Sequence, residues 1–341
     1  MQNMDPRWIF IIVAVAGLVA SVAILRFLLA TGLAWRLATD IPNDRSLHSK
    51  PVPRVGGWAI VPVVCVSIWI VAPGLWLAAV LALALAVLSQ IDDRRGLPAR
   101  VRFAAHIAAA TVFVAATPGA VPVWVLFVLG ILLVWLVNLY NFMDGSDGLA
   151  GGMALFGFSG YALAAGFGPH PDTQLALAAT AVAAAAAGFL FLNFHPARVF
   201  LGDAGSIPLG FLAGALGYWG WMKSVWPIWF PALIFLPFIA DASVTLVKRV
   251  LRREKVWLPH KEHYYQRMVR LGMGHAATAR AWYLVMAVGV VIATFALGLK
   301  PVMQWVVAGA WSVILLFAGV CIDRRWQQYQ GRMDNAKVIR K

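Results

Sequence analysis

Residues 173–193 read TQLALAATAVAAAAAGFLFLN, an apolar run without a charged side chain. A run of about 20 apolar residues is long enough to cross the hydrocarbon core of a bilayer as a helix. A helix is favoured there because lipid cannot hydrogen-bond exposed backbone groups. This stretch therefore predicts a membrane-spanning helix, and similar stretches occur along most of the chain.

The composition of the whole chain fits a membrane protein. Apolar residues make up 62% of the 341 residues and charged residues only 12%, whereas soluble domains carry about 25% charged residues. We expect a single polytopic, all-α membrane domain over residues 1–341. The first run has no basic region before it and no clean cleavage site after it, so we do not expect a signal peptide. Eleven runs are predicted to span the membrane: 7–29, 57–73, 75–90, 103–117, 121–139, 148–167, 173–193, 206–222, 226–247, 279–298 and 301–322.

Lysine and arginine predict the orientation of the chain. Of the 28 Lys and Arg residues, all but Arg7, Arg26, Lys223 and Lys300 fall in the C-terminal tail or in the loops after the odd-numbered runs. Basic loops stay in the cytoplasm, so we predict an external N-terminus and a cytoplasmic C-terminus. This topology explains the net charge of +14, and we expect no nucleic-acid partner. Cys65 and Cys321 both lie inside predicted runs, so we expect buried free thiols.

The predicted cytoplasmic loops contain most of the acidic residues. Asp92 and Asp93 follow the third run, and adjacent carboxylates suit Mg²⁺, which takes one or two carboxylates together with substrate phosphates. A solvated pair neutralised by Arg94 and Arg95 is the alternative.

Asn138, Asn141 and Asp144 follow the fifth run at a spacing of three, which would place them on one helix face. Polar groups at this depth are usually functional. The alternative is a polar helix end with Gly145 and Gly148 as turn residues.

The seventh loop runs from Asn193 to Ser206 and contains Asp203. Small residues at a helix start let a phosphate approach backbone amides, although this segment could equally cap the next helix. In the ninth loop, His260 and His263 suit a diphosphate. A zinc site is not favoured, because no third ligand lies at a supporting spacing. His106, within an apolar run, is interpreted as a packed or interfacial residue.

The loop between the first two runs, from Asp40 to Gly57, is rich in Pro and Gly and is therefore expected to be a shaped loop. Its cations Arg45 and Arg54, together with His48, could hold phosphates, and a plain topology signal is the alternative. We expect loops 30–56, 91–102, 140–147, 194–205 and 248–278 to form one cytoplasmic active site.

The order of these motifs resembles the polyprenyl-phosphate N-acetylhexosamine 1-phosphate transferase family, which is glycosyltransferase family 4. The resemblance covers Asp40 to Gln266. The strings that carry it are Asp40–Gly57, Asp92-Asp93, Asn138–Gly148, Asn193–Ser206 and His260–Gln266.

The resemblance implies an eleven-span fold in the bacterial inner membrane and a dependence on Mg²⁺, with Mn²⁺ as a possible substitute. Asp203 and Asp92 match metal-binding positions, and Asp92, Asp93 and Asp144 match catalytic ones. The positions that match substrate contacts are Asn138, Asn141, Asn193, His260, His263, Arg45, His48 and Arg54.

The reaction implied is transfer of an N-acetylhexosamine 1-phosphate from a UDP-sugar to undecaprenyl phosphate. The products are undecaprenyl-diphospho-sugar and UMP. Lys261 and Glu262 separate the two histidines, which resembles the branch that starts O-antigen synthesis and leaves the donor sugar open. A homodimer is a further possibility. Asp92 is expected to deprotonate or position the lipid phosphate, a covalent aspartyl-phosphate is the alternative route, and Asp241 is a candidate anchor behind the site.

Two other classes of membrane protein fit the sequence less well. A polytopic transporter would need ionisable residues near the bilayer midplane, whereas these lie at one edge. A CDP-alcohol phosphotransferase would need Ala-Arg after its Asp-Gly motif, and residues 144–148 read DGSDG.

Overall fold

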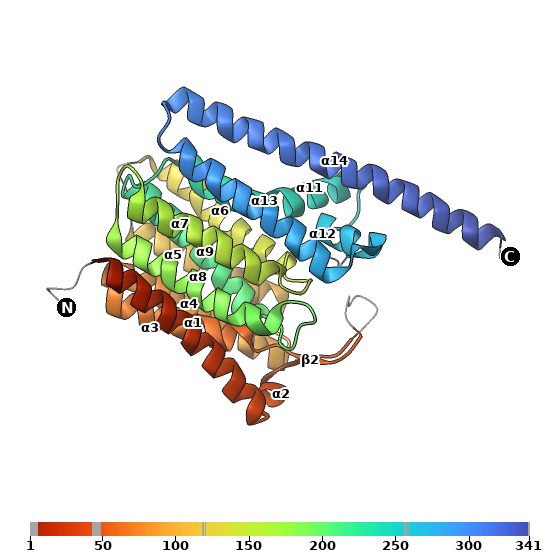
Figure 1. Ribbon diagram of the computed structural model, residues 1–341, viewed down its shortest axis with the longest axis horizontal. Coiled ribbons are helices and arrows are strands. Elements are labelled where there is room, and N and C mark those ends of the chain that lie inside the picture. Colours follow the sequence, from red (N-terminus) through yellow and green to blue (C-terminus); the bar gives the residue numbers. More distant parts are fainter. Residues whose placement is uncertain are drawn as a thin grey trace.

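The computed structural model describes residues 6–42, 49–117, 119, 121–255, 258 and 260–339. It is a bundle of helices that run side by side (Figure 1), with one two-stranded sheet in the described residues. The elements in chain order are α1 Pro6–Ala30, α2 Leu33–Leu37, β1 Thr39–Asp40, β2 Val52–Pro53, α3 Gly56–Val71, η1 Pro73–Leu75, α4 Trp76–Arg95, α5 Ala99–Ala116, α6 Val123–Phe142, α7 Leu149–Phe167, α8 Thr173–Asn193, α9 Asp203–Met222, α10 Trp229–Ile234, α11 Leu236–Leu251, α12 Tyr264–Met268, η2 Val269–Met273, α13 Gly274–Ala296 and α14 Pro301–Ile339.

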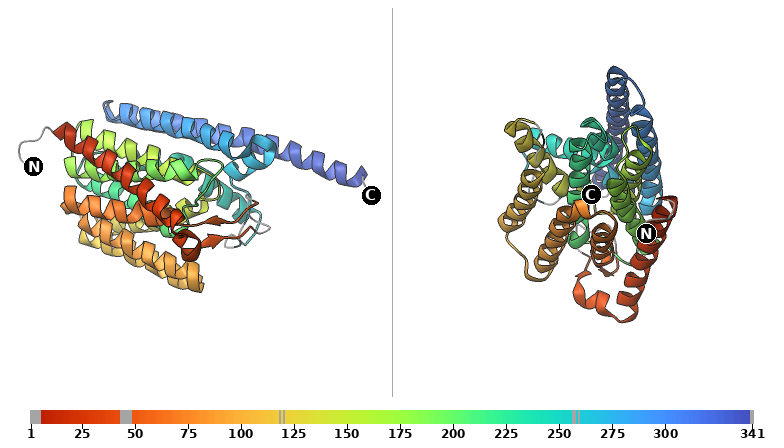
Figure 2. Two further views of the ribbon diagram at one scale, coloured as in Figure 1. Left: turned by 60° about the horizontal axis from the view of Figure 1, so that its bottom comes forward. Right: turned by 90° about the vertical axis from the view of Figure 1, so that its left-hand side faces the viewer.

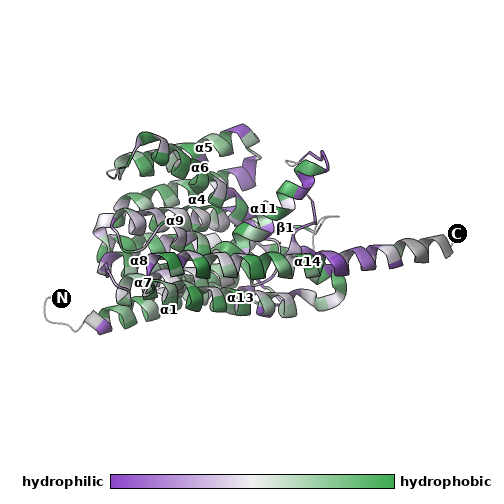
Figure 3. Cartoon of the chain, turned by 90° about the horizontal axis from the view of Figure 1, so that it is seen from above, coloured by the Kyte–Doolittle hydropathy of each residue, from purple (hydrophilic) through white to green (hydrophobic). Residues whose placement is uncertain are grey.

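The expectation of an all-α membrane protein is confirmed. Eight helical segments among the described residues are long and apolar enough to cross a membrane, and α3 is a shorter apolar helix. Large apolar side chains on the outside of the bundle, such as Phe167, Val302 and Phe317, are exposed, as expected for a lipid-facing surface. Figure 3 shows hydrophobic residues along the helices and hydrophilic residues where α14 leaves the bundle. The count of eleven spans and the orientation of the termini stay predictions.

The ninth predicted run, 226–247, is not one continuous helix. It is divided into α10 and α11 at Phe235. Pro237 stands in the first turn of α11, and a proline lacks the N–H that would continue the ladder from the helix before it. The break therefore has a local cause in the sequence.

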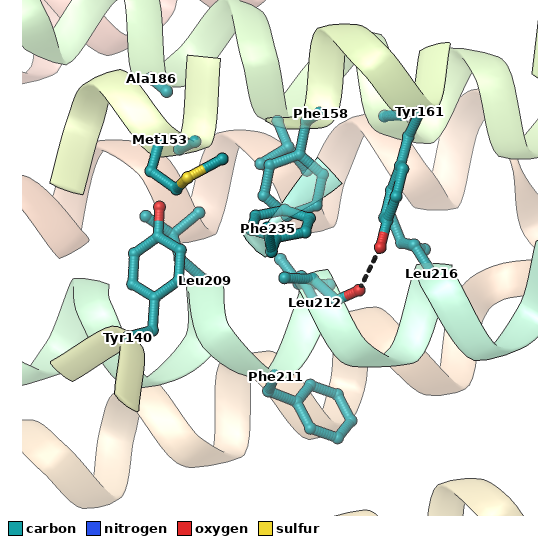
Figure 4. Packing of buried hydrophobic residues seen from close by; sticks show 14 of the residues in the cluster. Tyr140, Met153, Phe158, Tyr161, Ala186, Leu209, Phe211, Leu212, Leu216 and Phe235 are labelled. Atoms are coloured by element: carbon teal, nitrogen blue, oxygen red, sulfur yellow. Dashed lines mark hydrogen bonds between the residues drawn. The ribbon is translucent and has the colours of Figure 1, made fainter. Parts of the chain in front are cut away.

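Helix α9 lies at the centre of the bundle and packs against α3, α4 and α6. Nearly every residue on it is buried. Figure 4 shows aromatic side chains from α6, α7 and the turn before α11 around α9, with Phe158, Tyr161 and Phe235 close together. The hydroxyl of Tyr161 donates to Ala213 O at 3.0 Å, so its burial leaves no polar atom unpaired.

Two glycines determine how α9 begins. A Cβ atom on Gly57 would lie 2.4 Å from the carbonyl of Ala204, so α3 and α9 can meet at this point only without a side chain. Gly202 precedes α9 with a φ of 72°, in the left-handed region that glycine adopts without strain. Together they bring the loop before α3 against the loop before α9.

That loop is a small hairpin. Strands β1 and β2 pair antiparallel, with Thr39 opposite Pro53 and Asp40 opposite Val52. Arg54 then forms a parallel bridge with Phe200, which ties the hairpin to the segment before α9. Figure 2 shows the hairpin at the same end of the bundle toward which α14 extends. We call this end, where α4, α6, α8 and α11 finish, the polar end.

Both cysteines were expected to be buried free thiols, and this is confirmed for one of them. Cys65 on α3 is buried, and its Sγ donates to Ala79 O at 3.2 Å. The prediction for Cys321 was wrong, because it is exposed on α14. Most of the apolar surface of α14 faces away from the bundle, so an apolar run did not imply burial within the protein.

Candidate active site

Asp92 lies at the end of α4, and both of its carboxylate oxygens are in use. Oδ1 accepts the backbone N–H of Leu97 at 2.6 Å, and Oδ2 accepts from Arg102 Nη1 at 2.9 Å. These bonds hold the turn from α4 to α5 and place the Arg102 guanidinium. Sequence reasoning did not single out Arg102, which comes from the first turn of α5.

Asp93, unlike Asp92, has a carboxylate oxygen without a hydrogen bond. Its Oδ2 is buried and has no hydrogen-bond partner among the described atoms. Its Oδ1 lies 3.8 Å from Arg54 Nη1, and the other end of that guanidinium pairs with Asp40 at 2.9 Å. Asp93 therefore offers an unpartnered anionic oxygen, which a carboxylate buried for structural reasons alone would not retain.

Asp144 and Asp203 are the neighbouring carboxylates. Helix α6 ends at Phe142, so the expectation of a continuous helix face through Asp144 was wrong, and Asp144 lies in the loop after the helix. The backbone of Gly202 hydrogen-bonds to it. Burial, and next the nearby charge of Asp203, raise the pKa of Asp144 well above its ordinary value. Carboxylates that disfavour each other's charge in this way are stabilised by a cation.

The two asparagines of α6 face different partners. Asn141 Oδ1 accepts from the Ser206 hydroxyl at 2.8 Å, which links α6 to the first turn of α9. Asn138 Nδ2 donates to Val134 O at 2.7 Å on its own helix. Both asparagines line the polar cavity described below.

Asn193 is buried and connects two loops. Its Oδ1 accepts the N–H of Gly148 at 3.0 Å, and its Nδ2 donates to Val199 O at 2.9 Å. In this structure Asn193 therefore holds the loops that carry other residues in place. Its predicted role as a direct substrate contact stays a prediction.

A group missed in the sequence lies beside these loops. His195 Nδ1 lies 2.6 Å from Asp147 Oδ2, and the His195 ring stacks on His275 with centroids 5.3 Å apart. Ser146 Oγ lies 2.9 Å from His275 Nδ1. His275 lies in the first turn of α13, 80 residues after His195 in the sequence. A short sequence motif could therefore not have indicated that these residues meet.

Residues 260–266 form what we call the histidine segment. Asp241, which is 2% exposed, holds this segment in place. Its Oδ1 accepts the N–H of Tyr264 at 2.9 Å, and its Oδ2 accepts the N–H of Tyr265 at 3.1 Å. His263 Nδ1 lies 3.2 Å from the same Oδ1. Because Nδ1 faces this carboxylate, Nε2 is the ring nitrogen that is left for another partner.

His260 lies next to His263, with ring centroids 4.8 Å apart. Desolvation, followed by the charges of His263 and Arg249, lowers the pKa of His260 to about 4. The ring is therefore neutral at physiological pH in the free protein. Arg45 and His48, both predicted to bind substrate, lie outside the described residues.

Two adjacent cavities open beside the histidines. The first, which we call the polar cavity, has a volume of about 640 Å³. The second, the apolar groove between α5 and α6, has a volume of about 880 Å³. Both are lined by Phe103, Asn138, Phe142 and Leu246, so the two lie side by side. The remaining polar residues around the polar cavity are Arg100, Arg102, His106, Asn141, His260, His263 and Gln266.

The carboxylates of this site suit a divalent cation only in part. Within the described part of the chain, no three His, Cys, Asp or Glu side chains are grouped so that they could hold a metal ion. The unpartnered oxygen of Asp93 and the adjacent carboxylates of Asp144 and Asp203 nevertheless suit Mg²⁺, which takes few protein ligands and completes its shell with phosphate and water. The residues thus fit an ion that binds together with a phosphorylated substrate.

Comparison with known proteins identifies the class of this site. A model described as "Glycosyl transferase family 4" matches residues 75–220. The chain is 30% identical to the "Probable undecaprenyl-phosphate N-acetylglucosaminyl 1-phosphate transferase" of Bacillus subtilis (strain 168), over 94% of this chain and 93% of that protein. The chain belongs to the polyprenyl-phosphate N-acetylhexosamine 1-phosphate transferase family.

Other members of this transferase family are similarly related. The chain is 30% identical to the "Decaprenyl-phosphate N-acetylglucosaminephosphotransferase" of Mycobacterium tuberculosis (strain ATCC 25618 / H37Rv), over 80% of this chain and 79% of that protein. It is 25% identical to the "Undecaprenyl-phosphate alpha-N-acetylglucosaminyl 1-phosphate transferase" of Escherichia coli (strain K12), over 84% of each. The family predicted from the sequence is confirmed.

Proposed function

We propose that this transferase moves an N-acetylhexosamine 1-phosphate from a UDP-sugar to undecaprenyl phosphate at the cytoplasmic face of the membrane. The observation that supports this most directly is that the apolar groove and the polar cavity lie side by side and share four lining residues. An acceptor with a long prenyl chain and a phosphate head needs both environments side by side. The names of two relatives likewise describe transferases that act on undecaprenyl or decaprenyl phosphate with N-acetylglucosamine phosphate.

The reaction is a displacement at phosphorus. An oxygen of the acceptor phosphate forms a bond to the β-phosphorus of the donor, the bond from that phosphorus to the bridging oxygen breaks, and UMP leaves with the electron pair. Arg54 and the Nε2 side of His263 would bind and orient the diphosphate. Arg102, held by Asp92, would orient the acceptor phosphate.

A divalent cation is part of the proposal. Asp93 and Asp203 would hold Mg²⁺ together with the substrate phosphates, and the ion would neutralise the diphosphate charge when it is bound. Asp92 is less suited to this place than sequence reasoning assumed, because both of its oxygens already accept hydrogen bonds.

The chain's place in envelope synthesis is proposed from the histidine segment. Lys261 and Glu262 between the two histidines resemble the branch that starts O-antigen synthesis. The donor sugar is to be found by experiment.

The test is a transfer assay with purified protein, undecaprenyl phosphate, Mg²⁺ and one labelled donor at a time: UDP-GlcNAc, UDP-GalNAc or a 6-deoxy amino-sugar analogue. A labelled lipid product with equimolar UMP is expected for at least one donor. Asp203→Asn should lower the rate at least 100-fold at saturating Mg²⁺. Folded wild-type protein that forms no product with any donor would refute the proposal and favour a transporter.

A further inference from the structure

One imidazole occupies the junction of the polar cavity and the apolar groove. His106 on α5 lines the polar cavity. Phe103, one turn before it, lines both cavities, and Ile107, the next residue, lines the apolar groove. A chain lying in the groove would therefore present its polar head beside this ring.

One nitrogen of the His106 ring lacks a partner. The residue is 6% exposed, and its Nδ1 has no hydrogen bond among the described atoms. A buried ring nitrogen without a partner costs free energy, and such groups in native proteins usually have a protein, water or ligand partner. The Asn138 side chain hydrogen-bonds to the ring, yet Nδ1 has no partner among the described atoms.

A second cationic group points to what the partner is. Arg102 lies four residues before His106, on the same face of α5, and also lines the polar cavity. Asp92 holds its Nη1, which leaves other guanidinium N–H groups for a ligand. An arginine and an imidazole at the mouth of an apolar groove together suit an anionic head on an apolar chain.

We propose that His106 contacts the acceptor, with its Nδ1 side hydrogen-bonded to a phosphate oxygen of a prenyl monophosphate whose chain lies between α5 and α6. This inference rests on the proposed function, which it extends by naming a residue that recognises the acceptor phosphate. It replaces the interpretation of His106 as a packed residue.

The first experiment measures binding without turnover. In detergent, geranylgeranyl monophosphate should raise the Tm of the wild-type protein more than geranylgeraniol does. In His106→Leu the two ligands should have equal effects, because the chain is still bound but the phosphate contact is lost. His170→Leu makes the same substitution at an exposed histidine between α7 and α8, and it should behave like the wild type.

The second experiment separates the two substrates. With undecaprenyl phosphate as acceptor, His106→Leu should raise the KM for the acceptor about tenfold or more, as expected for a lost hydrogen bond to a charged group. The KM for the donor should stay within about twofold. His106→Asn, which keeps a polar atom near the position of Nδ1, should recover most of the loss.

The outcomes are distinct. If wild-type protein shows the phosphate-specific Tm shift, His106→Leu loses it, and no donor is turned over, then the proposed function fails while the assignment of His106 stands. A normal phosphate-specific shift in His106→Leu, or an increase confined to the donor KM, would overturn the assignment. Should the leucine variant not fold, ¹⁵N-histidine spectra of the wild type decide: the His106 ring signals must move with the monophosphate and not with the alcohol.

Discussion

The carboxylates of this site differ in the hydrogen-bond partners of their oxygens. Asp92 has a guanidinium and a backbone N–H as partners, whereas Asp93 keeps a buried oxygen with none among the described atoms. Adjacent residues of the same type can thus have different tasks. The first holds the framework, and the second is available to a ligand.

A double-mutant cycle tests this division. If Asp92 acts mainly by holding Arg102, then Asp92→Asn, Arg102→Gln and the double variant should lose similar activity, each on the order of tenfold, with a coupling energy of about 1–3 kcal/mol. Transfer rates at saturating substrates give the comparison. Losses that multiply in the double variant would show that Asp92 acts on the substrate directly.

Asp241 orients the imidazole ring of His263. Replacing it by Asn removes the carboxylate that contacts His263 Nδ1 and weakens the bonds to the backbone of Tyr264 and Tyr265. We expect Asp241→Asn to lower kcat by about 10–100-fold with a smaller change in the acceptor KM. Ser243→Ala, two residues along α11, is the control, and equal losses in both variants would contradict the assignment.

The pH dependence of stability should report on His260. Its pKa of about 4 in the folded protein lies below the ordinary value of about 6.5, so the unfolded chain binds more protons between these values. Stability is therefore lost as the pH falls through this window. The Tm of the wild type should drop more between pH 7 and pH 5 than the Tm of His260→Gln. Parallel pH profiles for the two proteins would rule out this role.

The sequence revealed the residue types of the site better than their partners. Five polar loops, one after every second predicted span, indicated where carboxylates, asparagines and histidines gather. The order of the loops and their content of Lys and Arg can be read directly from the sequence. The sequence could not show that Arg102 uses Asp92, or that His275 stacks on His195. Both contacts depend on how separate helices meet.

At the scale of the helices, the contact of α3 with α9 positions the site. Gly57→Ala would place a Cβ 2.4 Å from the backbone of Ala204, and the helices must then separate. Overpacking of this kind costs about 1–3 kcal/mol, so the Tm should fall by several degrees. Activity should also fall, because Arg54 moves away from Asp93. Gly130→Ala on α6, where a Cβ meets nothing within 4 Å, should not lower the Tm.

Most helices could be predicted because apolar runs of the right length have few alternatives in a membrane protein. The break at Phe235 was missed because hydropathy continues across it, although Pro237 provided a local signal. Helix α14 was underestimated for the opposite reason. It continues to Ile339, well past the apolar run that ends near residue 322, because polar residues can extend a helix that has already formed.

In the molecule as a whole, α14 is fastened to the histidine segment where it leaves the apolar region. Asp323 pairs with Arg267 at 2.7 Å and with Lys248, and it accepts from the Tyr264 hydroxyl at 3.2 Å. Trp326 packs under Arg270, whose guanidinium lies 4.6 Å from the ring centroid. The last helix thereby supports the segment that carries His263.

Breaking this attachment should affect both stability and donor binding. Asp323→Asn removes the closer of the two carboxylates that pair with the buried Arg267 and leaves Glu262 at 3.6 Å, at a cost of about 1–3 kcal/mol. We expect a lower Tm and a donor KM raised several-fold, measured in the transfer assay. Arg325→Gln, an exposed neighbour on the same helix, should change neither value. An unchanged donor KM in Asp323→Asn would mean that the attachment is purely structural.

The length of α14 has a mechanical consequence. From Asp323 to Ile339 the helix continues for about 24 Å at 1.5 Å per residue, so it acts as a lever with its fulcrum at the attachment. A tilt of about 5° at Asp323 would move the far end by about 2 Å. A pair of fluorophores, one on this arm and one on the hairpin before α3, would therefore convert a small rearrangement around the bound diphosphate into a measurable change in distance.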